Sequence, residues 1–288
     1  MVPCRPSPAC ARAAGTVRVP AIELGVGEIH VWEVEPEAIA VQERLDRYAA
    51  WLSAAEVARR QRFKFERHRH GFLIARALVR GTLTRYVPAI APEGWRFVIG
   101  AHGRPEIDPS LGAGDLRFNL SHTHGRAVLA VARGDDVGVD VEARDRKGNL
   151  RGISTHFFAA PEVASLDGLD GPALAERFFD YWTLKEAYMK ARGVGISLGL
   201  GRFWFTIADD GAIAINFVDG FDDEPADWSF RRFDLGPIHP VALALRRPRG
   251  APLDVKLHRA LPGEPLMSVE TIAGGASTGL VVAGLGSL

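Results

Sequence analysis

The 288-residue sequence predicts an α+β protein built from two similar α/β halves. Three observations carry this prediction. Short segments in which apolar and polar residues alternate recur along the chain, as in strands. A long helical pattern interrupts the strand signals once in each half. Apolar residues make up 47% and charged residues 24% of the chain, which is ordinary for a globular protein with a sizeable core.

The first half begins with a strand pattern over Gly27–Val34. Helices are expected over Glu37–Trp51 and over Ser53–Tyr86, and the second of these starts with Ser53 and Glu56 at the spacing of a capping box. Three further strands are then expected, over Arg96–Ile99, Leu116–Ser121 and Ala127–Ala132.

The second half begins after a predicted hairpin turn at Gly134-Asp135-Asp136, with a strand over Val137–Glu142. A helix is expected over Pro172–Ala191, stopped by the glycines that follow it. After about Gly250 the sequence changes character, and from Ala273 it is small, apolar and glycine-rich, so we expect a tail or irregular extension. The remaining predicted strands are Arg202–Ile207, Ala212–Phe217, Trp228–Asp234 and Val241–Leu245.

These signals divide the chain into a flexible N-terminal arm (1–18), a first half (19–136), a second half (137–250) and a C-terminal extension (251–288). Both cysteines, Cys4 and Cys10, lie in the arm, so we expect free thiols rather than a disulfide framework. The arm lacks the apolar core of a secretory signal, and no apolar run reaches membrane-spanning length. A cytoplasmic protein is therefore expected.

The formal net charge is +0, with Lys+Arg 35 against Asp+Glu 35. A balanced chain has no global attraction to nucleic acid or to an anionic membrane, so neither is expected as a partner. Any anion site must be local, and one basic run is a candidate. It is either a phosphate site or a solvated helix and loop. The run consists of Arg59, Arg60, Arg62, Lys64, Arg67, His68, Arg69 and His70.

Two acidic residues alternate with valines in the strand predicted over Val137–Glu142. Alternate side chains of a strand face opposite sides, so the valines face a core while Gly138, Asp140 and Glu142 share the other face. Two carboxylates this close repel each other unless a cation lies between them, and Mg²⁺ usually takes one or two carboxylates plus phosphate oxygens. Gly138 leaves room beside them. The pattern indicates either a magnesium site or a solvated strand face.

The helical segment around Trp182 is too aromatic for an exposed helix. Glu186 lies one turn after Trp182, and Lys190 lies one turn further on. A carboxylate beside an apolar stripe is costly unless it is paired. The residues alone leave two interpretations open, a functional carboxylate or an ordinary surface Glu–Lys pair.

Three segments together, in their order and separation, resemble the Sfp-type phosphopantetheinyl transferase family. They are Phe118–Thr123 (Phe-Asn-Leu-Ser-His-Thr), Gly138–Glu142 (Gly-Val-Asp-Val-Glu) and Trp182–Lys190 (Trp-Thr-Leu-Lys-Glu-Ala-Tyr-Met-Lys). Gly103-Arg104-Pro105 precedes them, as a Gly-Lys/Arg-Pro element does in the family. The resemblance covers roughly Arg59 to Phe205.

The resemblance implies two α/β halves packed about a pseudo-twofold axis in a monomer that resembles a dimer. The joint is expected near Asp135–Val137, with coenzyme A bound in the cleft between the halves. The implied activity is transfer of the 4'-phosphopantetheine group from coenzyme A to a serine of an apo acyl or peptidyl carrier protein. Magnesium is the implied cofactor, and adenosine 3',5'-bisphosphate is the implied by-product.

The resemblance also assigns site residues. Asp140, Glu142 and Glu186 are expected to bind magnesium together with the pyrophosphate. Glu186, or a water molecule that it orients, is the expected base for the carrier serine, and Lys190 is expected to protonate or neutralise the leaving phosphate. For Lys185, contact with phosphate and an orientation to solvent are equally compatible with the sequence. Gly71 departs from the family pattern, because relatives often carry a basic residue at this position. The implied coenzyme A contacts are Arg69, Arg76, Arg104, Ser121, His122 and Lys185.

Two other classes of protein share part of this pattern. A magnesium-dependent nucleotide phosphohydrolase would also use the acids and the basic run, and its product distinguishes it, because hydrolysis needs no carrier protein. A carrier-binding module without catalysis is disfavoured by the complete set of Asp140, Glu142, Glu186 and Lys190. The sequence does not specify which carrier protein is modified.

Overall fold

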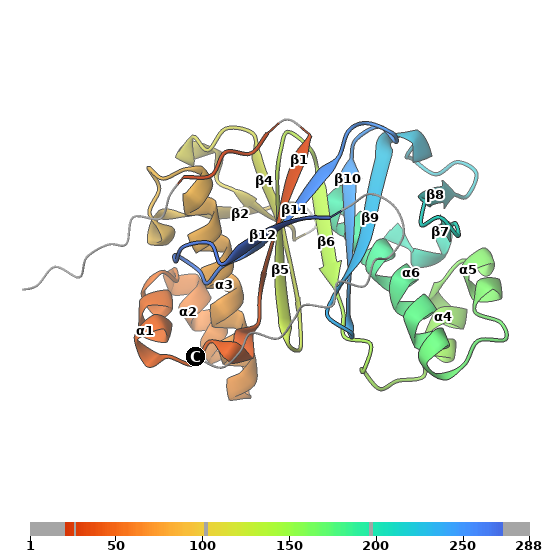
Figure 1. The fold of residues 1–288 in the computed structure, drawn as a ribbon, viewed down its shortest axis with the longest axis horizontal. Helices are drawn as coiled ribbons and strands as arrows, with labels where there is room; N and C mark the ends of the chain where they lie inside the picture. The colour runs from red at the N-terminus through yellow and green to blue at the C-terminus, as the bar shows by residue number, and fades with distance from the viewer. Residues whose placement is uncertain (1–20, 26, 101–102, 196–197, 273–288) are drawn as a thin grey trace, which may run out of the picture.

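The computed structural model describes residues 21–25, 27–100, 103–195 and 198–272. It has the predicted α+β fold, in which two sheets lie side by side at the centre with helices on either side (Figure 1). The predicted flexible arm, which contains both cysteines, and the glycine-rich stretch from Ala273 lie outside the described residues.

The first sheet has the strand order β12-β11-β1-β5-β4. Three of its strands were predicted, and they form antiparallel pairs, β1 with β5 and β5 with β4. These three strands are β1 (Glu28–Val34), β4 (Leu116–Thr123) and β5 (Arg126–Arg133). A short hairpin of β2 (Phe97–Ile99) and β3 (Pro105–Ile107) lies in the same half of the chain.

Three helices, α1 (Gln42–Ala50), α2 (Ala54–Gln61) and α3 (Glu66–Tyr86), belong to this half, and α3 packs on the outer face of the first sheet. The predicted capping box begins α2: the Ser53 hydroxyl accepts the Glu56 N–H, and the Glu56 carboxylate accepts the Ser53 N–H. The sequence predicted one helix from Ser53 to Tyr86, and this was wrong. The chain turns between α2 and α3, where the Arg69 guanidinium donates to the Phe63 carbonyl at 2.7 Å.

The second sheet has the order β6-β10-β9, and α6 covers its outer face. Two short helices that the sequence did not predict precede α6, and a small hairpin of β7 and β8 follows it. Among the described residues, no helix is long and apolar enough to cross a bilayer. The elements are β6 (Val137–Val141), α4 (Leu150–Phe157), α5 (Ala160–Ser165), α6 (Gly171–Arg192), β7 (Phe203–Ile207), β8 (Ile213–Phe217), β9 (Trp228–Leu235) and β10 (His239–Arg246).

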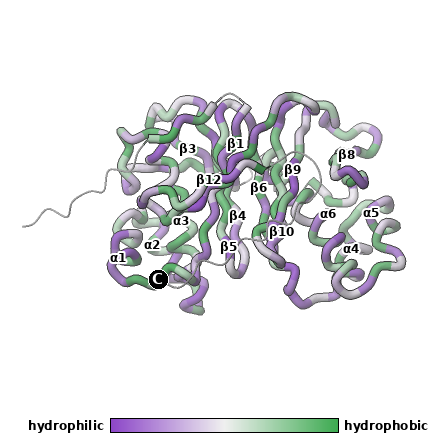
Figure 2. Tube along the Cα trace, in the orientation of Figure 1, coloured by the Kyte–Doolittle hydropathy of each residue, from purple (hydrophilic) through white to green (hydrophobic). Residues whose placement is uncertain are grey.

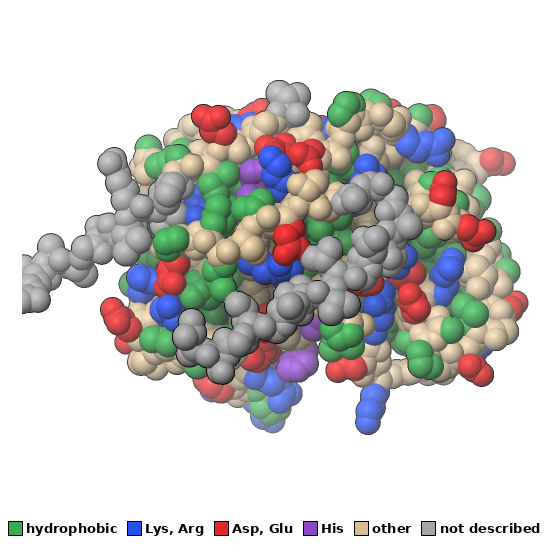
Figure 3. Space-filling model, in the orientation of Figure 1, with side chains coloured by type: hydrophobic (Ala, Val, Ile, Leu, Met, Phe, Trp, Pro, Cys, Tyr) green, Lys and Arg blue, Asp and Glu red, His purple; other side chains and the backbone are tan. Residues whose placement is uncertain are grey.

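The two sheets share one apolar layer, and each also packs against its own long helix, so hydrophobic residues run along both sheets and the helices beside them (Figure 2). Val137, Val139 and Val141 of β6 point into the shared layer, as the alternation predicted, where they meet Ile29 and Val31 of β1. The opposite face of β6, with Gly138 and Asp140, therefore turns toward α6. Acidic and basic side chains are mixed over the surface in Figure 3, in keeping with the net charge of +0.

The turn Gly134-Asp135-Asp136 is not a hairpin, which corrects the prediction. The strands on its two sides belong to different sheets, since β5 pairs with β1 and β4 while β6 pairs with β10. The turn carries the chain from the first sheet to the second. Local sequence predicts a reversal of direction here, but not the strand with which each neighbour pairs.

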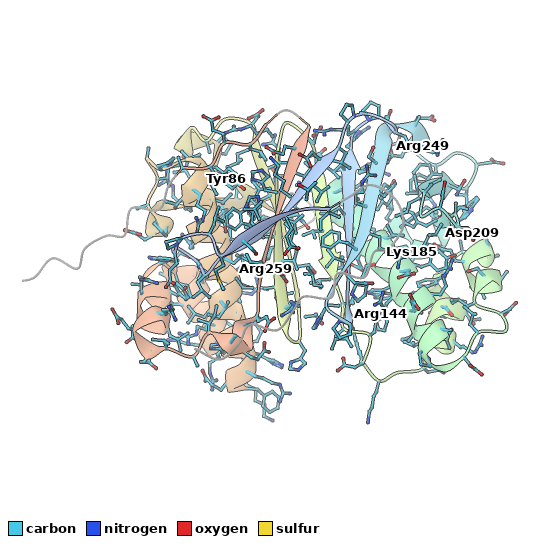
Figure 4. The ribbon with its side chains drawn as sticks, in the orientation of Figure 1. Tyr86, Arg144, Lys185, Asp209, Arg249 and Arg259 are labelled. Atoms are coloured by element: carbon cyan, nitrogen blue, oxygen red, sulfur yellow. The ribbon has the colours of Figure 1, made fainter. Side chains whose placement is uncertain are left out.

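The chain after Gly250 returns to the first half, and the prediction of a tail or irregular extension is wrong for most of its described part. Strand β11 (Asp254–Arg259) pairs in parallel with β1, and β12 (Ser268–Ile272) pairs with β11 at the sheet edge. Val255 and Leu257 are buried, and Arg259 lies in the same half as Tyr86 (Figure 4). Strand β11 is therefore an interior strand of the first sheet.

Candidate active site

Helix α6 lies directly against β6 at Gly138. A Cβ atom built on this glycine would lie 2.0 Å from the Ala187 oxygen and 2.5 Å from the Ala191 nitrogen. Any side chain here would push the helix away from the strand. The space that we expected beside the acids is thus filled by helix backbone. This close contact brings the segment of α6 that carries Glu186 and Lys190 up to Asp140.

Asp140 is buried and forms an ion pair with Lys190, whose Nζ lies 2.6 Å from Oδ1. Lys190 Nζ also donates to Ser121 Oγ at 3.0 Å and to the Val139 carbonyl at 3.2 Å. The Ser121 hydroxyl donates to Asp140 Oδ1 at 2.9 Å and accepts the Val141 N–H at 3.3 Å. Residues from β4, β6 and α6 thus form one hydrogen-bonded cluster between the halves.

The second oxygen of Asp140, Oδ2, is buried and has no hydrogen-bond partner within the part of the chain that the structure describes. Glu142 lies just beyond the end of β6, where Oε1 accepts the Trp182 Nε1–H at 3.2 Å and Oε2 lies 3.8 Å from Arg146 Nη1. A buried carboxylate oxygen without a donor is costly, so the site favours an added cation or hydrogen-bond donor.

Charge repulsion links the three predicted metal ligands. Burial, followed by the negative charges of Asp140 and Glu142, raises the pKa of Glu186 to about 7, although the nearby Lys190 ammonium opposes the shift. Burial and the charge of Asp140 likewise raise the pKa of Glu142. The charge of Asp140 thus disfavours ionisation of both glutamates, as expected for acids that lie close together.

The acidic residues present could supply only part of the coordination shell of a magnesium ion. Among the residues that the structure describes, no group of three His, Cys, Asp or Glu side chains is arranged to hold a metal ion. Lys190 occupies one oxygen of Asp140, and the other oxygen has no partner. Magnesium usually binds through one or two carboxylates, with substrate phosphates and water completing the shell. Asp140 and its acidic neighbours match that ligand chemistry.

A second cluster, on the first half, is cationic. The guanidinium groups of Arg76 on α3 and Arg59 on α2 lie 5.2 Å and 5.7 Å from the centre of the Phe72 ring. Arg76 Nε is buried without a hydrogen-bond partner, and burial lowers the pKa of Arg76. A desolvated guanidinium with an unused donor is suited to a phosphate, which arginine binds with paired hydrogen bonds.

His122, at the end of β4, links the two clusters. Much of the residue is solvent-exposed, yet enough protein surrounds the imidazole for burial to be the main cause of its lowered pKa. The charges of Arg76, Lys190 and Arg59 lower the pKa of His122 further. His122 therefore lies within electrostatic reach of cations from both halves, and is neutral at neutral pH.

From the basic run, the sequence predicted a contact with coenzyme A for Arg69 and not for Arg59. Arg69 instead lies in the first turn of α3, where its Nε is 2.6 Å from Glu66 Oε2. It lines a separate hollow of about 300 Å³, together with Leu52 and Arg60. The structure does not bring Arg69 to the acids. The basic run predicted a local anion site. Which of its arginines lies near His122 depends on how α2 packs against α3, and this could not be predicted from the sequence.

Lys185 is also excluded from the site, so its predicted contact with coenzyme A is wrong, as is the alternative orientation to solvent. Its side chain is fully buried, and Nζ lies 2.8 Å from Glu162 Oε2. It also donates to the carbonyls of Leu200 at 2.8 Å and Phe203 at 2.6 Å. Lys185 lies inside the second half (Figure 4), where it joins α5 and α6 to the segment before β7.

Ser121 and Asn119 of β4 hold the acidic strand. The Ser121 hydroxyl has one donor and two acceptor positions, and Asp140, Lys190 and the Val141 N–H use all three. Asn119 Oδ1 accepts the Val139 N–H at 2.9 Å. The backbone on both sides of Asp140 is thus held by side chains of the other sheet. Contact of Ser121 with coenzyme A stays a prediction.

Comparison with known proteins identifies the family. A family model described as the 4'-phosphopantetheinyl transferase superfamily matches residues 136–245. The 4'-phosphopantetheinyl transferase HetI of Nostoc sp. is 30% identical over 233 residues, which are 73% of this chain and 96% of HetI. The chain belongs to the 4'-phosphopantetheinyl transferase superfamily. The superfamily is one of transferases, so the resemblance and the enzyme class predicted from the sequence are both confirmed.

Two Bacillus subtilis proteins illustrate the likeness within this superfamily. One, named 4'-phosphopantetheinyl transferase, is 30% identical over 203 residues, 70% of this chain and 86% of its own length. The other, 4'-phosphopantetheinyl transferase Sfp of strain 168, is 27% identical over 207 residues, 72% of this chain and 88% of its own. The part matched by the family model contains Asp140, Glu142, Glu186 and Lys190, while the cationic cluster of Arg59 and Arg76 precedes it.

Proposed function

We propose that this transferase moves the 4'-phosphopantetheine group of coenzyme A onto a serine of an apo acyl or peptidyl carrier protein and releases adenosine 3',5'-bisphosphate. The names of the relatives support the type of transfer. The observation in this chain that carries the proposal is the buried, unpartnered Oδ2 of Asp140 beside two acids with raised pKa values. That arrangement favours a divalent cation and, through it, a pyrophosphate.

We further propose that Asp140, Glu142 and Glu186 hold magnesium. The ion would neutralise the charge of the pyrophosphate as it is cleaved. In its absence Lys190 supplies the positive charge nearest to Asp140, at 2.6 Å. A bound ion would relieve the repulsion among the three carboxylates and free the Lys190 ammonium to contact phosphate oxygens.

The cationic cluster would bind the other phosphate oxygens of coenzyme A. Arg76 has an unused buried donor, and Arg59 lies on the other side of the same Phe72 ring. His122, with its lowered pKa, supplies a neutral ring and therefore one hydrogen bond donor. Coenzyme A in this position would contact the second half through its pyrophosphate and the first half through its remaining phosphate oxygens. It would therefore lie between the halves, as in the cleft predicted from the resemblance.

Glu186 is the best candidate for the base. In the metal-free protein a pKa of about 7 makes this carboxylate more basic than an ordinary glutamate, and a bound cation would lower the pKa and favour the ionised form that accepts a proton. The serine hydroxyl would lose its proton to Glu186 as its oxygen bonds to the β-phosphorus. The bond from that phosphorus to the bridging oxygen breaks, and Lys190 neutralises or protonates the leaving phosphate.

The two halves are proposed to be related by a pseudo-twofold axis, with the joint near Asp135–Val137 and a monomer as the working unit. Each half has a sheet and one long helix on its outer face: α3 has 21 residues and α6 has 22. The first half also includes β11 and β12, so a division of the chain at residues 136 and 250 assigns the last strands to the wrong unit.

The test is to incubate the purified protein with magnesium chloride, coenzyme A and a panel of apo-carrier proteins, and to weigh each carrier by intact mass spectrometry. We expect at least one carrier to gain the phosphopantetheine group, with an equal amount of adenosine 3',5'-bisphosphate released. Nucleotide release without a carrier would indicate a phosphohydrolase. A folded protein that modifies no carrier in a broad panel would refute the proposed function.

A further inference from the structure

The last turn of α6 ends in a motif that leaves the backbone carbonyl of Ala191, among others, to be satisfied by another partner. The final carbonyl groups of any helix lack intrahelical donors. Gly193 has a left-handed conformation (φ 67°), and its N–H donates to the Lys190 carbonyl at 3.2 Å, while the Val194 N–H donates to the Met189 carbonyl at 3.3 Å. This is the Schellman pattern, which does not provide a donor for the carbonyl of Ala191.

Arg104 provides that donor from the other half of the molecule. Its Nη1 donates to the Ala191 carbonyl at 2.6 Å, and its Nη2 donates to the Val137 carbonyl at 3.4 Å. The side chain is 9% exposed, and Asp136 lies 3.8 Å from Nη1 as its counter-charge. The residue lies between β2 and β3 of the first half, so it crosses to the second half to reach α6.

The two carbonyls belong to the two elements that build the acidic site. Val137 begins β6, the strand that carries Asp140, and Ala191 directly follows Lys190 on α6. The guanidinium therefore joins helix and strand beside Gly138, where the two backbones are in closest contact. A planar guanidinium with donors in a fixed fork suits this task, because it sets the distance between two acceptors.

Most of the Arg104 guanidinium is used by the chain itself. Both terminal nitrogens donate to backbone carbonyls, whereas Nε is buried and, like Arg76 Nε, has no hydrogen-bond partner among the described residues. The contrast with Arg76 lies in the terminal nitrogens: within the described part of the chain, those of Arg76 donate to no backbone carbonyl or carboxylate, and its guanidinium lies 5.2 Å from the centre of the Phe72 ring.

We infer that Arg104 is a positioning residue, which holds the last turn of α6 against β6 and so keeps the Lys190 ammonium at Asp140. This replaces the contact with coenzyme A that the sequence predicted for Arg104. The effect on turnover rests on the proposed function. The effect on the helix end does not, because it concerns hydrogen bonds within the chain.

The test compares Arg104→Met, Arg104→Gln and Arg104→Lys with the wild type and with Arg76→Gln as the matched control. Hydrogen exchange of the amides at 191–194 is measured without ligands, to report opening of the helix end. The Kd of coenzyme A is measured by calorimetry with magnesium, and kcat with coenzyme A and carrier saturating. Circular dichroism and thermal melting establish that each variant is folded.

We expect Arg104→Met to speed exchange in the last turn of α6 about tenfold or more, since local opening becomes easier. Its kcat should fall about tenfold or more, because a displaced Lys190 no longer meets the phosphate, while the Kd of coenzyme A stays within about twofold. Gln and Lys each keep a donor for one carbonyl, so both variants should recover part of kcat. Arg76→Gln should give the opposite result, a weaker Kd with normal exchange at 191–194.

The proposal is overturned if Arg104→Met weakens the Kd of coenzyme A as Arg76→Gln does, or if exchange at 191–194 is unchanged. If Arg104→Met does not fold, the same comparison with Arg104→Gln and Arg104→Lys decides. A wild-type protein that neither binds coenzyme A nor modifies a carrier would refute the proposed function instead, and the exchange measurement would still test the contact of Arg104 with the helix.

Discussion

Gly138→Ala tests whether the close contact of α6 with β6 assembles the site. The added Cβ would lie 2.0 Å from the Ala187 oxygen, against 3.4 Å for an ordinary contact. Backbone atoms cannot rotate away as a side chain can, so α6 must withdraw by about 1.4 Å, the difference between these two distances, or the strand must move by the same amount.

The displacement acts directly on Lys190 and Asp140, which lie on opposite sides of this contact. Their separation is now 2.6 Å. A rigid withdrawal of α6 would take it to about 4 Å, beyond hydrogen-bond distance. Misplacement of a catalytic group by about 1 Å can cost roughly 100-fold in rate, and overpacking usually costs about 1–3 kcal/mol of stability. We therefore expect kcat to fall about 100-fold in a protein that still folds.

The assay is kcat for carrier modification at saturating coenzyme A and magnesium, with urea unfolding of the same samples. Leu243→Ala is the matched control, because Leu243 is buried in the shared layer between the sheets and opposes Val139 on the neighbouring strand. It should cost about 2–5 kcal/mol of stability and little activity at a temperature where the protein is folded. A Gly138→Ala enzyme with wild-type kcat would refute the reasoning.

Four further predictions concern Glu186, strand β11 and Lys185. The Glu186 pKa of about 7 makes the folded protein bind more protons than the unfolded chain between about pH 4.5 and 7, so stability falls as the pH rises through that window. Glu186→Gln should therefore raise the free energy of unfolding of the metal-free protein more at pH 8 than at pH 5, by no more than about 2 kcal/mol after allowance for partial exposure. The larger rise in melting temperature should be seen at pH 8, and equal rises at both pH values would contradict this pKa. Added magnesium should restore part of the turnover lost in Glu186→Gln, and full recovery would exclude a role as base. Truncation after Arg249 removes the buried apolar side chains of Val255 and Leu257, worth roughly 4 kcal/mol, together with the buried His258, and uncovers β1. The truncated chain should therefore lose its cooperative melting transition, and a stable, active fragment would show otherwise. Lys185→Met should cost about 3–5 kcal/mol in chemical denaturation by leaving Glu162 buried without its cation, and adding Glu162→Leu should recover most of that loss.

The acidic strand was predictable from sequence because strand periodicity is a local property. Every second residue of Val137–Val141 faces the shared apolar layer, so Asp140 had to face the other way. The helical stripe that carries Glu186 and Lys190 was predictable for the same reason, since it depends on residues within two turns of each other. Neither pattern indicated that the two segments touch, and that contact depends on the backbone approach at Gly138.

The last strands of the first sheet show where local patterns end. Asp254–Arg259 alternates over only six residues, which is weak evidence for a strand. Its parallel partner is β1, more than 200 residues earlier in the chain, and the register Glu28 with Asp254 is set by burial of Val255 and Leu257. Composition suggested a tail because it averages over this short strand and the glycine-rich stretch beyond it.

The sequence by itself determined the fold class, the family and the face of β6 that carries the acids, because each is written in local spacing and in the order of short motifs. The tertiary structure decided which charged residues are free to act. Lys185 and Glu186 are neighbours on one helix, yet Lys185 pairs with Glu162 inside the second half, while Glu186 lies close enough to Asp140 for the charge of Asp140 to raise its pKa. The same holds for Arg104, whose terminal nitrogens are used by the end of α6 and the start of β6, and for Arg76, whose guanidinium lies against the Phe72 ring. A charged side chain has the same sequence signature whether its partner is a ligand or a distant part of its own chain, and only packing brings that partner within reach.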